Sequence, residues 1–148
     1  MIEVENAHPR TRLPKEPFRR LLRCLLRREG VTAARLSVVF VGHEETRRLN
    51  AQFLNHRRST DVIAFPLGEE ASVEGEIYVN IDQAREQCAL YGAAFAEETA
   101  RLVLHGTLHL LGYDDRTPRK RRTMRGREDA MLRLCWHGLR SDLRRERG

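Results

Sequence analysis

The chain has 148 residues, 41% of them hydrophobic and 32% charged, which is the size and composition of one ordinary globular domain. No apolar run approaches the roughly 18 residues that a membrane-spanning helix needs. The acidic start M-I-E-V-E-N also lacks the basic-then-apolar pattern of a secretory signal. We therefore expect a single domain over residues 1–148 that works in the cytoplasm and has no membrane partner.

Charge is concentrated towards the end of the chain. The formal net charge is +6, and residues 116–148 carry twelve basic and four acidic side chains. Arginine, which suits bidentate phosphate contacts, far outnumbers lysine. This pattern favours a nucleic-acid partner, although a solvated helix face explains the charge equally well. We expect a basic, flexible C-terminal tail from about residue 136 to residue 148.

The first half of the chain alternates strand and helix signals. Residues 2–5 alternate apolar and polar side chains, as a short strand does. Residues 17–29 have apolar side chains at helical spacing before Gly30, which can end the helix. Residues 35–41 are rich in β-branched side chains and predict a second strand, and residues 44–54 predict a second helix.

The middle of the chain reads as a pair of strands with loops. A polar loop at residues 55–59 precedes a strand at residues 60–67, which its proline closes. Residues 68–75 are acidic and loop-like. Residues 75–81 place three β-branched side chains on one face and predict a half-exposed strand.

Three helices complete the prediction. The first has Asp82 as its expected N-cap and ends near residue 91. Residues 96–111 have the strongest helical pattern, and a basic helix follows over residues 119–134. The order β-α-β-α-β-β-α-α-α predicts an α+β fold, with about five helices packed on one mixed sheet of about four strands.

The segment H-G-T-L-H-L-L-G-Y-D-D, residues 105–115, carries the chemistry. His105 and His109 are four residues apart on a helix, so both imidazoles point the same way and can bind one ion. Gly112 can take a left-handed conformation, end the helix and bring Asp115 back to that ion. Two imidazoles and a carboxylate leave one position open for water, as in hydrolytic zinc sites.

Two alternatives stand beside this metal site. Interior histidines are usually satisfied by hydrogen bonds alone, but the apolar helix, the glycine exit and the nearby carboxylate together favour a metal. Zinc proteases have a similar spacing, with a general-base Glu after the first histidine. Here that position is Gly106, which cannot transfer a proton, so peptide hydrolysis is the weaker hypothesis.

Three cysteines, Cys24, Cys88 and Cys135, are far apart and form no C-x-x-C pair. An odd, scattered set is typical of a reducing compartment and is poor material for a disulfide framework. Each lies among apolar residues at helical spacing, so we interpret all three as core residues. We expect no disulfide partner and no cysteine ligand for the metal.

The run H-G-T-L-H-L-L-G-Y-D closely resembles the signature of the YbeY family, metal-dependent endoribonucleases of bacterial ribosomal RNA maturation. L-N-A-Q-F-L-N-H-R-R-S-T-D-V-I-A-F-P, residues 49–66, resembles the family's second motif, and G-E-I-Y-V, residues 75–79, its next strand. The resemblance covers residues 2–134. It implies an α+β domain, one zinc ion, and cleavage of single-stranded RNA in 16S rRNA 3′-end maturation and ribosome quality control. The implied partner is RNA of the small ribosomal subunit.

The resemblance also assigns the ligands, with one departure. His105 and His109 match the family's first two ligands, whereas the family usually has His where this chain has Asp115. Asp114 matches a position that is Asp in the family, so Asp115 is the expected third ligand. A carboxylate binds zinc well, but its charge weakens the ion as a Lewis acid and also suits harder ions such as Mn²⁺.

The second motif carries the expected substrate contacts. Many members of the family have a phosphate-binding arginine at the position of Leu54, and Arg57 and Arg58 are candidates to replace it. Thr60 and Asp61 match the motif. Solvated loop charges and an Asx-type turn explain these four residues without a substrate.

Together these features predict metal-dependent scission of an RNA backbone bond, with the basic loop and C-terminal segment holding the phosphates. No side chain identifies itself as the general base. The alternative from another class is a non-catalytic ribosome-assembly factor that binds rRNA through the same surface and keeps the metal for structure. The changed third ligand and the missing arginine favour that alternative.

Overall fold

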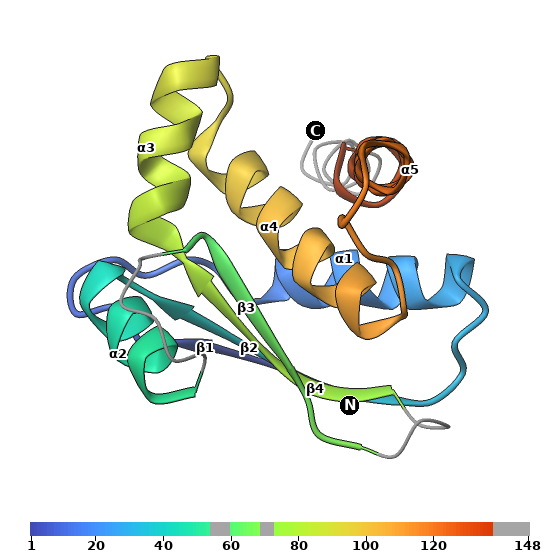
Figure 1. Cartoon of the computed structure of the whole chain (residues 1–148), viewed down its shortest axis with the longest axis horizontal. Coiled ribbons are helices and arrows are strands. Elements are labelled where there is room, and N and C mark those ends of the chain that lie inside the picture. Colours follow the sequence, from blue (N-terminus) through green and yellow to red (C-terminus); the bar gives the residue numbers. More distant parts are fainter. Residues whose placement is uncertain (54–59, 69–72, 138–148) are drawn as a thin grey trace, which may run out of the picture.

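A computed structural model describes residues 1–53, 60–68 and 73–137 of the chain (Figure 1). The strands within these residues are β1 (Ile2–Asn6), β2 (Ala34–Val41), β3 (Val62–Pro66) and β4 (Val73–Asn80). The helices are α1 (Glu16–Arg28), α2 (His43–Phe53), α3 (Ile81–Tyr91), α4 (Phe95–Leu110), α5 (Pro118–Met131) and the π-helical turn η1 (Leu132–His137). The predicted order of elements is confirmed. No helix in the described part of the chain is long and apolar enough to cross a membrane.

The strands form one mixed sheet, as predicted, and their order in it is β1-β2-β4-β3. β2 pairs in parallel with both β1 and β4, and β3 runs antiparallel to β4 at the edge. The register places Val4, Val38, Ile77 and Ala64 in one row across the sheet. Because side chains alternate along a strand, this row and the rows two residues away face the same layer of helices.

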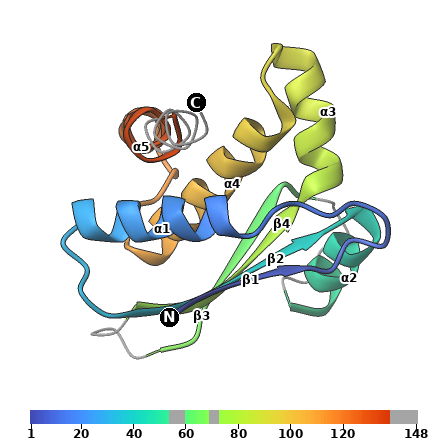
Figure 2. The same ribbon diagram turned by 180° about the vertical axis from the view of Figure 1, so that it is seen from behind.

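Helices cover both faces of the sheet unequally. α1 and α4 lie across one face and bury the main hydrophobic core there, whereas α2 covers part of the other face (Figure 1, Figure 2). The main core is centred on large, fully buried side chains: Phe18, Leu21, Phe40, Ile77, Leu104 and Leu108. α5 packs on α4 on the side away from the sheet. α4 therefore lies between the sheet and α5, and its polar face borders the groove beside α5.

A glycine lets α4 approach the sheet closely. A Cβ at Gly106 would lie 2.7 Å from Cγ2 of Ile77 and 2.9 Å from Cγ2 of Val62, so no larger side chain fits without movement. Position 106 therefore faces the sheet. A glutamate there would meet the core, which weakens the protease hypothesis on packing grounds as well as chemical ones.

The structure corrects two local predictions around β4. This strand begins at Val73, inside the segment expected to be a loop, because Val73 and Glu74 pair with Ala34 and Arg35 of β2. Backbone pairing along the whole length of β2 extends β4 to Val73, although the composition of this segment is acidic and typical of a loop. Residues 54–59, most of which were expected to form the polar loop, lie outside the described residues.

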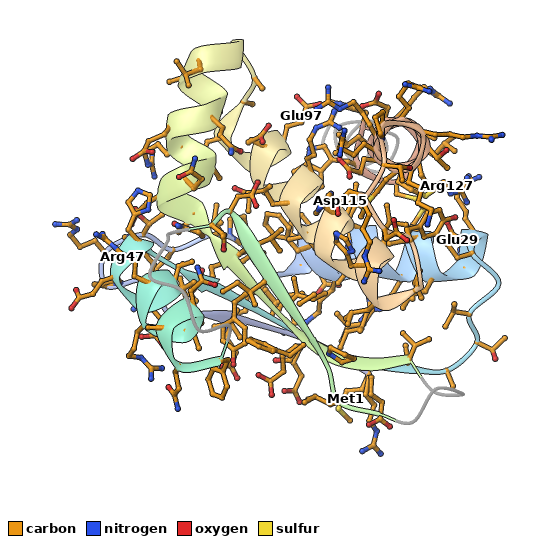
Figure 3. All side chains as sticks on the ribbon, in the orientation of Figure 1. Met1, Glu29, Arg47, Glu97, Asp115 and Arg127 are labelled. Carbon is orange, nitrogen blue, oxygen red and sulfur yellow. A yellow bond between two sulfur atoms is a disulfide. The ribbon has the colours of Figure 1, made fainter. Side chains whose placement is uncertain are left out.

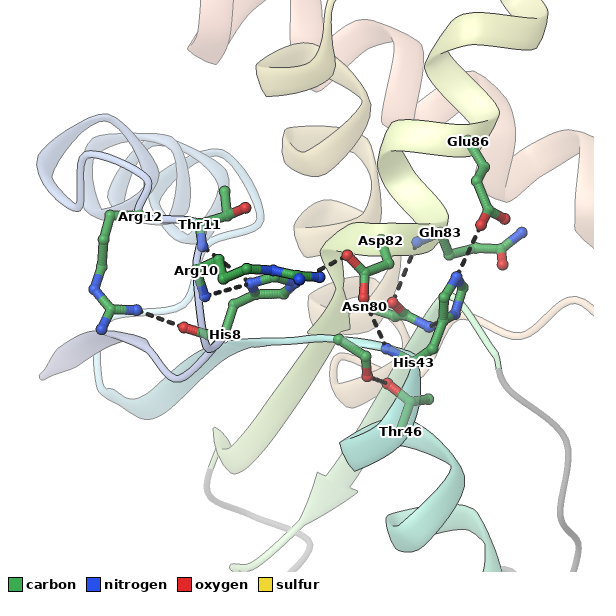
Figure 4. Close-up of polar contacts among 11 residues, drawn as sticks. His8, Arg10, Thr11, Arg12, His43, Thr46, Asn80, Asp82, Gln83 and Glu86 are labelled. Atoms are coloured by element: carbon green, nitrogen blue, oxygen red, sulfur yellow. Dashed lines mark hydrogen bonds and ion pairs between the residues drawn. The ribbon is translucent and has the colours of Figure 1, made fainter.

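The N-cap of α3 also differs from the prediction. Asn80, not Asp82, caps the helix, and its side chain accepts the Gln83 N–H at 3.2 Å. Asp82 instead accepts hydrogen bonds from the His43 N–H at 3.1 Å and from Nε2 of His8 at 2.9 Å (Figure 4). The two partners are 39 and 74 residues away in sequence, so local pattern could not indicate them.

The interpretation of the cysteines as plain core residues, poor material for a disulfide, is wrong for two of them. Cys24 and Cys135 form a disulfide that joins α1 to η1 across 111 residues, with their Cα atoms 5.6 Å apart. The pairing depends on how two distant helices pack, which cysteine spacing does not reveal. Cys88 is free.

Trp136, where the C-terminal tail was expected to begin, belongs to the turn η1. Trp136 is 3% exposed and its ring centroid lies 5.2 Å from that of Phe18, so η1 belongs to the core. The large buried surface of an indole ring holds this turn against α1. Residues 138–148 lie outside the described part of the chain.

Candidate metal centre

The end of α4 presents two imidazoles on one side. His105 and His109 lie four residues apart in the last two turns, and their ring centroids are 4.7 Å apart. The helix ends at Leu110 and Gly112 adopts a positive φ of 104°, as predicted. The Gly112 N–H then donates to the His109 carbonyl at 3.1 Å. This turn sends the chain back towards the histidines.

The segment after the turn is anchored on both sides. The Tyr113 hydroxyl donates to the Glu29 carboxylate at 3.0 Å, and Arg127 of α5 donates to the same carboxylate at 2.7 Å (Figure 3). On the α5 side, a guanidinium N–H of Arg121 donates to the Asp115 carbonyl at 3.2 Å. These contacts fix the backbone so that the Asp115 side chain lies between α4 and α5.

Asp114 is turned away from the histidines. Its carboxylate accepts the Arg116 N–H at 3.1 Å and the Lys120 ammonium at 3.1 Å, and these contacts lower the pKa of the Asp114 carboxyl. Of the two consecutive aspartates, Asp115 is therefore the one that joins the histidines.

Three ligand atoms converge at this point. Nε2 of His105 lies 3.2 Å from Nε2 of His109, and Oδ2 of Asp115 lies 3.7 Å and 3.8 Å from these two nitrogens. A tetrahedral zinc ion with bonds of about 2.0–2.2 Å would hold its ligands about 3.3 Å apart. The donor set and its spacing fit zinc with a small adjustment of Asp115. Within the described part of the chain, these three residues form the one group of three or more His, Cys, Asp or Glu side chains whose ligand atoms all lie within 4.8 Å of one another.

A fourth residue contacts His105 at Nδ1, the ring nitrogen that does not face the other ligands. Oε2 of Glu128 lies 2.7 Å from Nδ1 of His105, and the Glu128 side chain is only 8% exposed. Arg101 contributes a guanidinium 3.4 Å from the other oxygen of Glu128. A carboxylate that accepts the Nδ1 proton leaves Nε2 free to bind an ion, as in carboxylate–histidine–zinc triads.

The acidic surroundings change the pKa of His105. Burial alone would lower it, but the hydrogen bond and charge of Glu128, helped by Asp61 and Asp115, outweigh burial and raise the pKa. Glu98, about two turns earlier on α4, has a raised carboxyl pKa because of burial and the nearby charges of Asp61 and Glu128. This concentration of negative charge favours a divalent cation.

The metal centre opens into a cleft between α4 and α5. One cavity of about 580 Å³ is lined by His105, Asp115 and the arginines Arg121, Arg122 and Arg125, among others. A second cavity of about 590 Å³ continues the cleft, since both share Asp61, His105, Arg125 and Glu128. The cleft is large enough for several groups of a polymeric substrate.

The residues predicted from the second motif have different places. Asp61 lines both cavities beside His105, whereas Thr60 accepts a hydrogen bond from the Asn50 amide at 3.4 Å. Arg57 and Arg58 lie outside the described residues. Glu128 was missed, because the sequence gives only a glutamate in a basic helix, with no local sign that it meets a histidine.

A two-histidine, one-carboxylate centre in an α+β domain is the kind of site found in metal-dependent hydrolases. The family described as Endoribonuclease YbeY matches residues 3–135. The Endoribonuclease YbeY of Chlorobium phaeovibrioides is 36% identical over 140 residues, covering 95% of this chain and 94% of the relative. That of Salinibacter ruber is also 36% identical, covering 88% and 89%.

A solved structure is also similar. The solution structure of TM1509 from Thermotoga maritima matches with a TM-score of 0.69 and 29% identity, over 96% of this chain and 93% of that one. The chain therefore belongs to the YbeY endoribonuclease family. The resemblance first seen in two motifs extends over nearly the whole sequence.

Proposed function

We propose that this chain is a zinc-dependent endoribonuclease that cleaves single-stranded RNA, acting in the cytoplasm in 16S rRNA 3′-end maturation and ribosome quality control. The observation that supports it best is the convergence of His105, His109 and Asp115 within 3.2–3.8 Å in an open cleft. Membership of the endoribonuclease family supplies the reaction and the polymer.

The protein's own residues have separate tasks in this proposal. His105, His109 and Asp115 would hold the ion, which supplies Lewis-acid polarisation of a phosphate and activation of water. Glu128 accepts the Nδ1 proton of His105 and thereby keeps its Nε2 available. The Asp115 carboxylate adds an oxygen ligand that Mn²⁺ also accepts, so Mn²⁺ is the second candidate ion.

An assay on purified full-length protein tests the activity. Zinc-loaded wild-type protein should cleave a single-stranded oligoribonucleotide and leave the same strand largely intact when it is annealed to its complement. H109A and D115A should each lose at least about a hundredfold in rate, because a metal centre lacking one of three ligands holds its ion poorly. Equal cleavage by all three proteins would indicate a contaminating nuclease and refute the proposed activity.

The cellular role needs its own test. Depletion of the protein should cause 3′-extended precursors of 16S rRNA to accumulate, and wild-type protein but not H109A should remove them. If H109A restores maturation as well as the wild type does, the metal centre is not needed for processing. The non-catalytic assembly factor would then be the better account.

A further inference from the structure

One side of α5 carries a row of arginines beside the metal centre. Arg125 follows Arg121 by four residues and Arg122 by three, so its side chain is a neighbour of both on the helix surface. All three line the cavity that contains His105 and Asp115. Arg125 also lines the second cavity, where the cleft continues.

Two of these arginines have no side-chain partner among the described residues. Arg122 and Arg125 are exposed, and neither has an ion pair or hydrogen bond from its side chain to any residue within the described ranges. Two other basic side chains of α5 are engaged: Lys120 with Asp114 at 3.1 Å and Arg127 with Glu29 at 2.7 Å. Lys120 and Arg127 therefore hold the fold together through ion pairs, whereas Arg122 and Arg125 face the cleft.

The third arginine links this row to the metal centre. Arg121 uses one guanidinium N–H on the Asp115 carbonyl at 3.2 Å. A guanidinium has five N–H donors, so the contact leaves others for a ligand. Arg121 thus connects the Asp115 segment to whatever binds along the row.

The two ends of the cleft differ in charge. Beyond the residues that line both cavities, the second cavity is lined by Glu98 and Asp129, and its own cation Arg101 is paired with Asp129 at 2.7 Å. A polyanion placed in the cleft is therefore attracted to the Arg121–Arg125 end and repelled at the other. Complementary charge in a cleft also raises the local concentration of such a ligand.

We propose that Arg121, Arg122 and Arg125 form a phosphate-binding wall that holds the backbone of single-stranded RNA on one side of the metal centre. The proposal rests on the proposed nuclease function for its choice of polyanion. Guanidinium groups bind phosphate bidentately, and contacts to phosphate carry little sequence information. The strand is thus positioned by α5 with low sequence preference, and the phosphodiester next to the wall lies at His105, His109 and Asp115.

The test compares two pairs of arginines with equal charge. R122Q/R125Q removes two cations that face the cleft, and R119Q/R133Q removes two exposed cations that do not line either cavity. Glutamine keeps much of the aliphatic stem, and unchanged thermal midpoints would show that both variants fold. Affinity for a fluorescent single-stranded oligoribonucleotide is measured over a range of salt on metal-free full-length protein, so that no cleavage occurs.

The cleft pair should lose about tenfold or more in affinity at low salt. Its slope of log affinity against log salt should fall by about 1.4, because each single-strand phosphate contact contributes about 0.7. The control pair should change affinity by less than about threefold, and R122K/R125K should restore most of the salt slope because lysine keeps the charge. Equal losses of RNA affinity in the two double variants would refute the proposed phosphate-binding wall.

This outcome is separable from the nuclease proposal. If the cleft pair alone loses RNA affinity but zinc-loaded wild-type protein does not cleave, the wall stands and the nuclease activity is refuted. If the wild type cleaves and the two pairs bind RNA alike, the activity stands and the wall is refuted.

Discussion

Oε2 of Glu128 lies 2.7 Å from Nδ1 of His105, on the opposite edge of the ring from the Nε2 that faces His109 and Asp115. The carboxylate is nearly buried and is itself held by Arg101. One contact therefore ties α5 to α4 and sets which nitrogen of His105 carries its proton. The metal centre therefore depends on how α5 packs on α4, and not on the signature segment alone.

Glu128→Gln should weaken zinc binding by about ten- to a hundredfold, because it removes the charge that orients His105 and increases its basicity. Zinc affinity is measured by competition with a chelator of known strength. Asp129→Asn is the matched control: Asp129 is the next residue and pairs with Arg101, not with a histidine. Similar losses in both variants would contradict a specific role for Glu128.

The choice between the two aspartates can be tested directly. Asp115→Ala should reduce zinc affinity by more than about a hundredfold, a larger loss than removal of a supporting contact. Asp114→Ala should reduce it only a few-fold, since Asp114 contacts Lys120 and Arg116. Asp115→His should retain zinc, because imidazole is an equally good ligand. The assignment fails if Asp114→Ala is the more damaging change.

The raised pKa of His105 predicts a pH dependence in the metal-free protein. A group whose folded pKa exceeds its unfolded value of about 6.5 stabilises the fold below that value. The contribution is lost as pH rises through the raised folded pKa. The difference in unfolding free energy between wild type and H105Q, measured by urea denaturation without metal, should therefore shrink as pH increases. A difference that grows with pH would contradict the shift.

The affinity for zinc should depend on pH in the opposite direction. The ion needs a neutral imidazole, so binding displaces the proton from His105 and affinity should rise over the same pH range. Proton release on zinc binding, measured by calorimetry in buffers of different ionisation enthalpy, checks this. H105Q provides the background.

Gly106→Ala should destabilise the fold by about 1–3 kcal/mol through overpacking, although alanine is the better helix former. The reason is the close contact with Ile77 and Val62. Gly126→Ala, in open space on α5, should instead stabilise by about 0.5–1 kcal/mol. Chemical denaturation measures both, and a shift in the same direction for the two glycines would contradict the packing argument.

The parts of the site that could be predicted are local in sequence. Helical spacing places His105 and His109 on one side, and a positive φ at Gly112 needs only the glycine itself. The return of Asp115 follows from that turn. The sheet was predictable for a similar reason, since each strand carries its own alternation or β-branched run.

The parts that were missed depend on contacts between distant segments. Glu128 meets His105 from another helix, and Cys24 meets Cys135 across 111 residues. Neither residue has a periodicity or neighbour that signals its partner. Asp82 is a residue type that often caps helices, yet its carboxylate accepts hydrogen bonds from the remote His43 and His8 and not from the N–H groups of α3.

Metal analysis of freshly purified full-length protein tests the central claim most directly. We expect about one equivalent of zinc per chain, as for a single three-ligand site, and little in a His109→Ala variant prepared in parallel. Less than about a tenth of an equivalent of any transition metal in the wild type, not restored by added zinc, would contradict the metal centre formed by His105, His109 and Asp115.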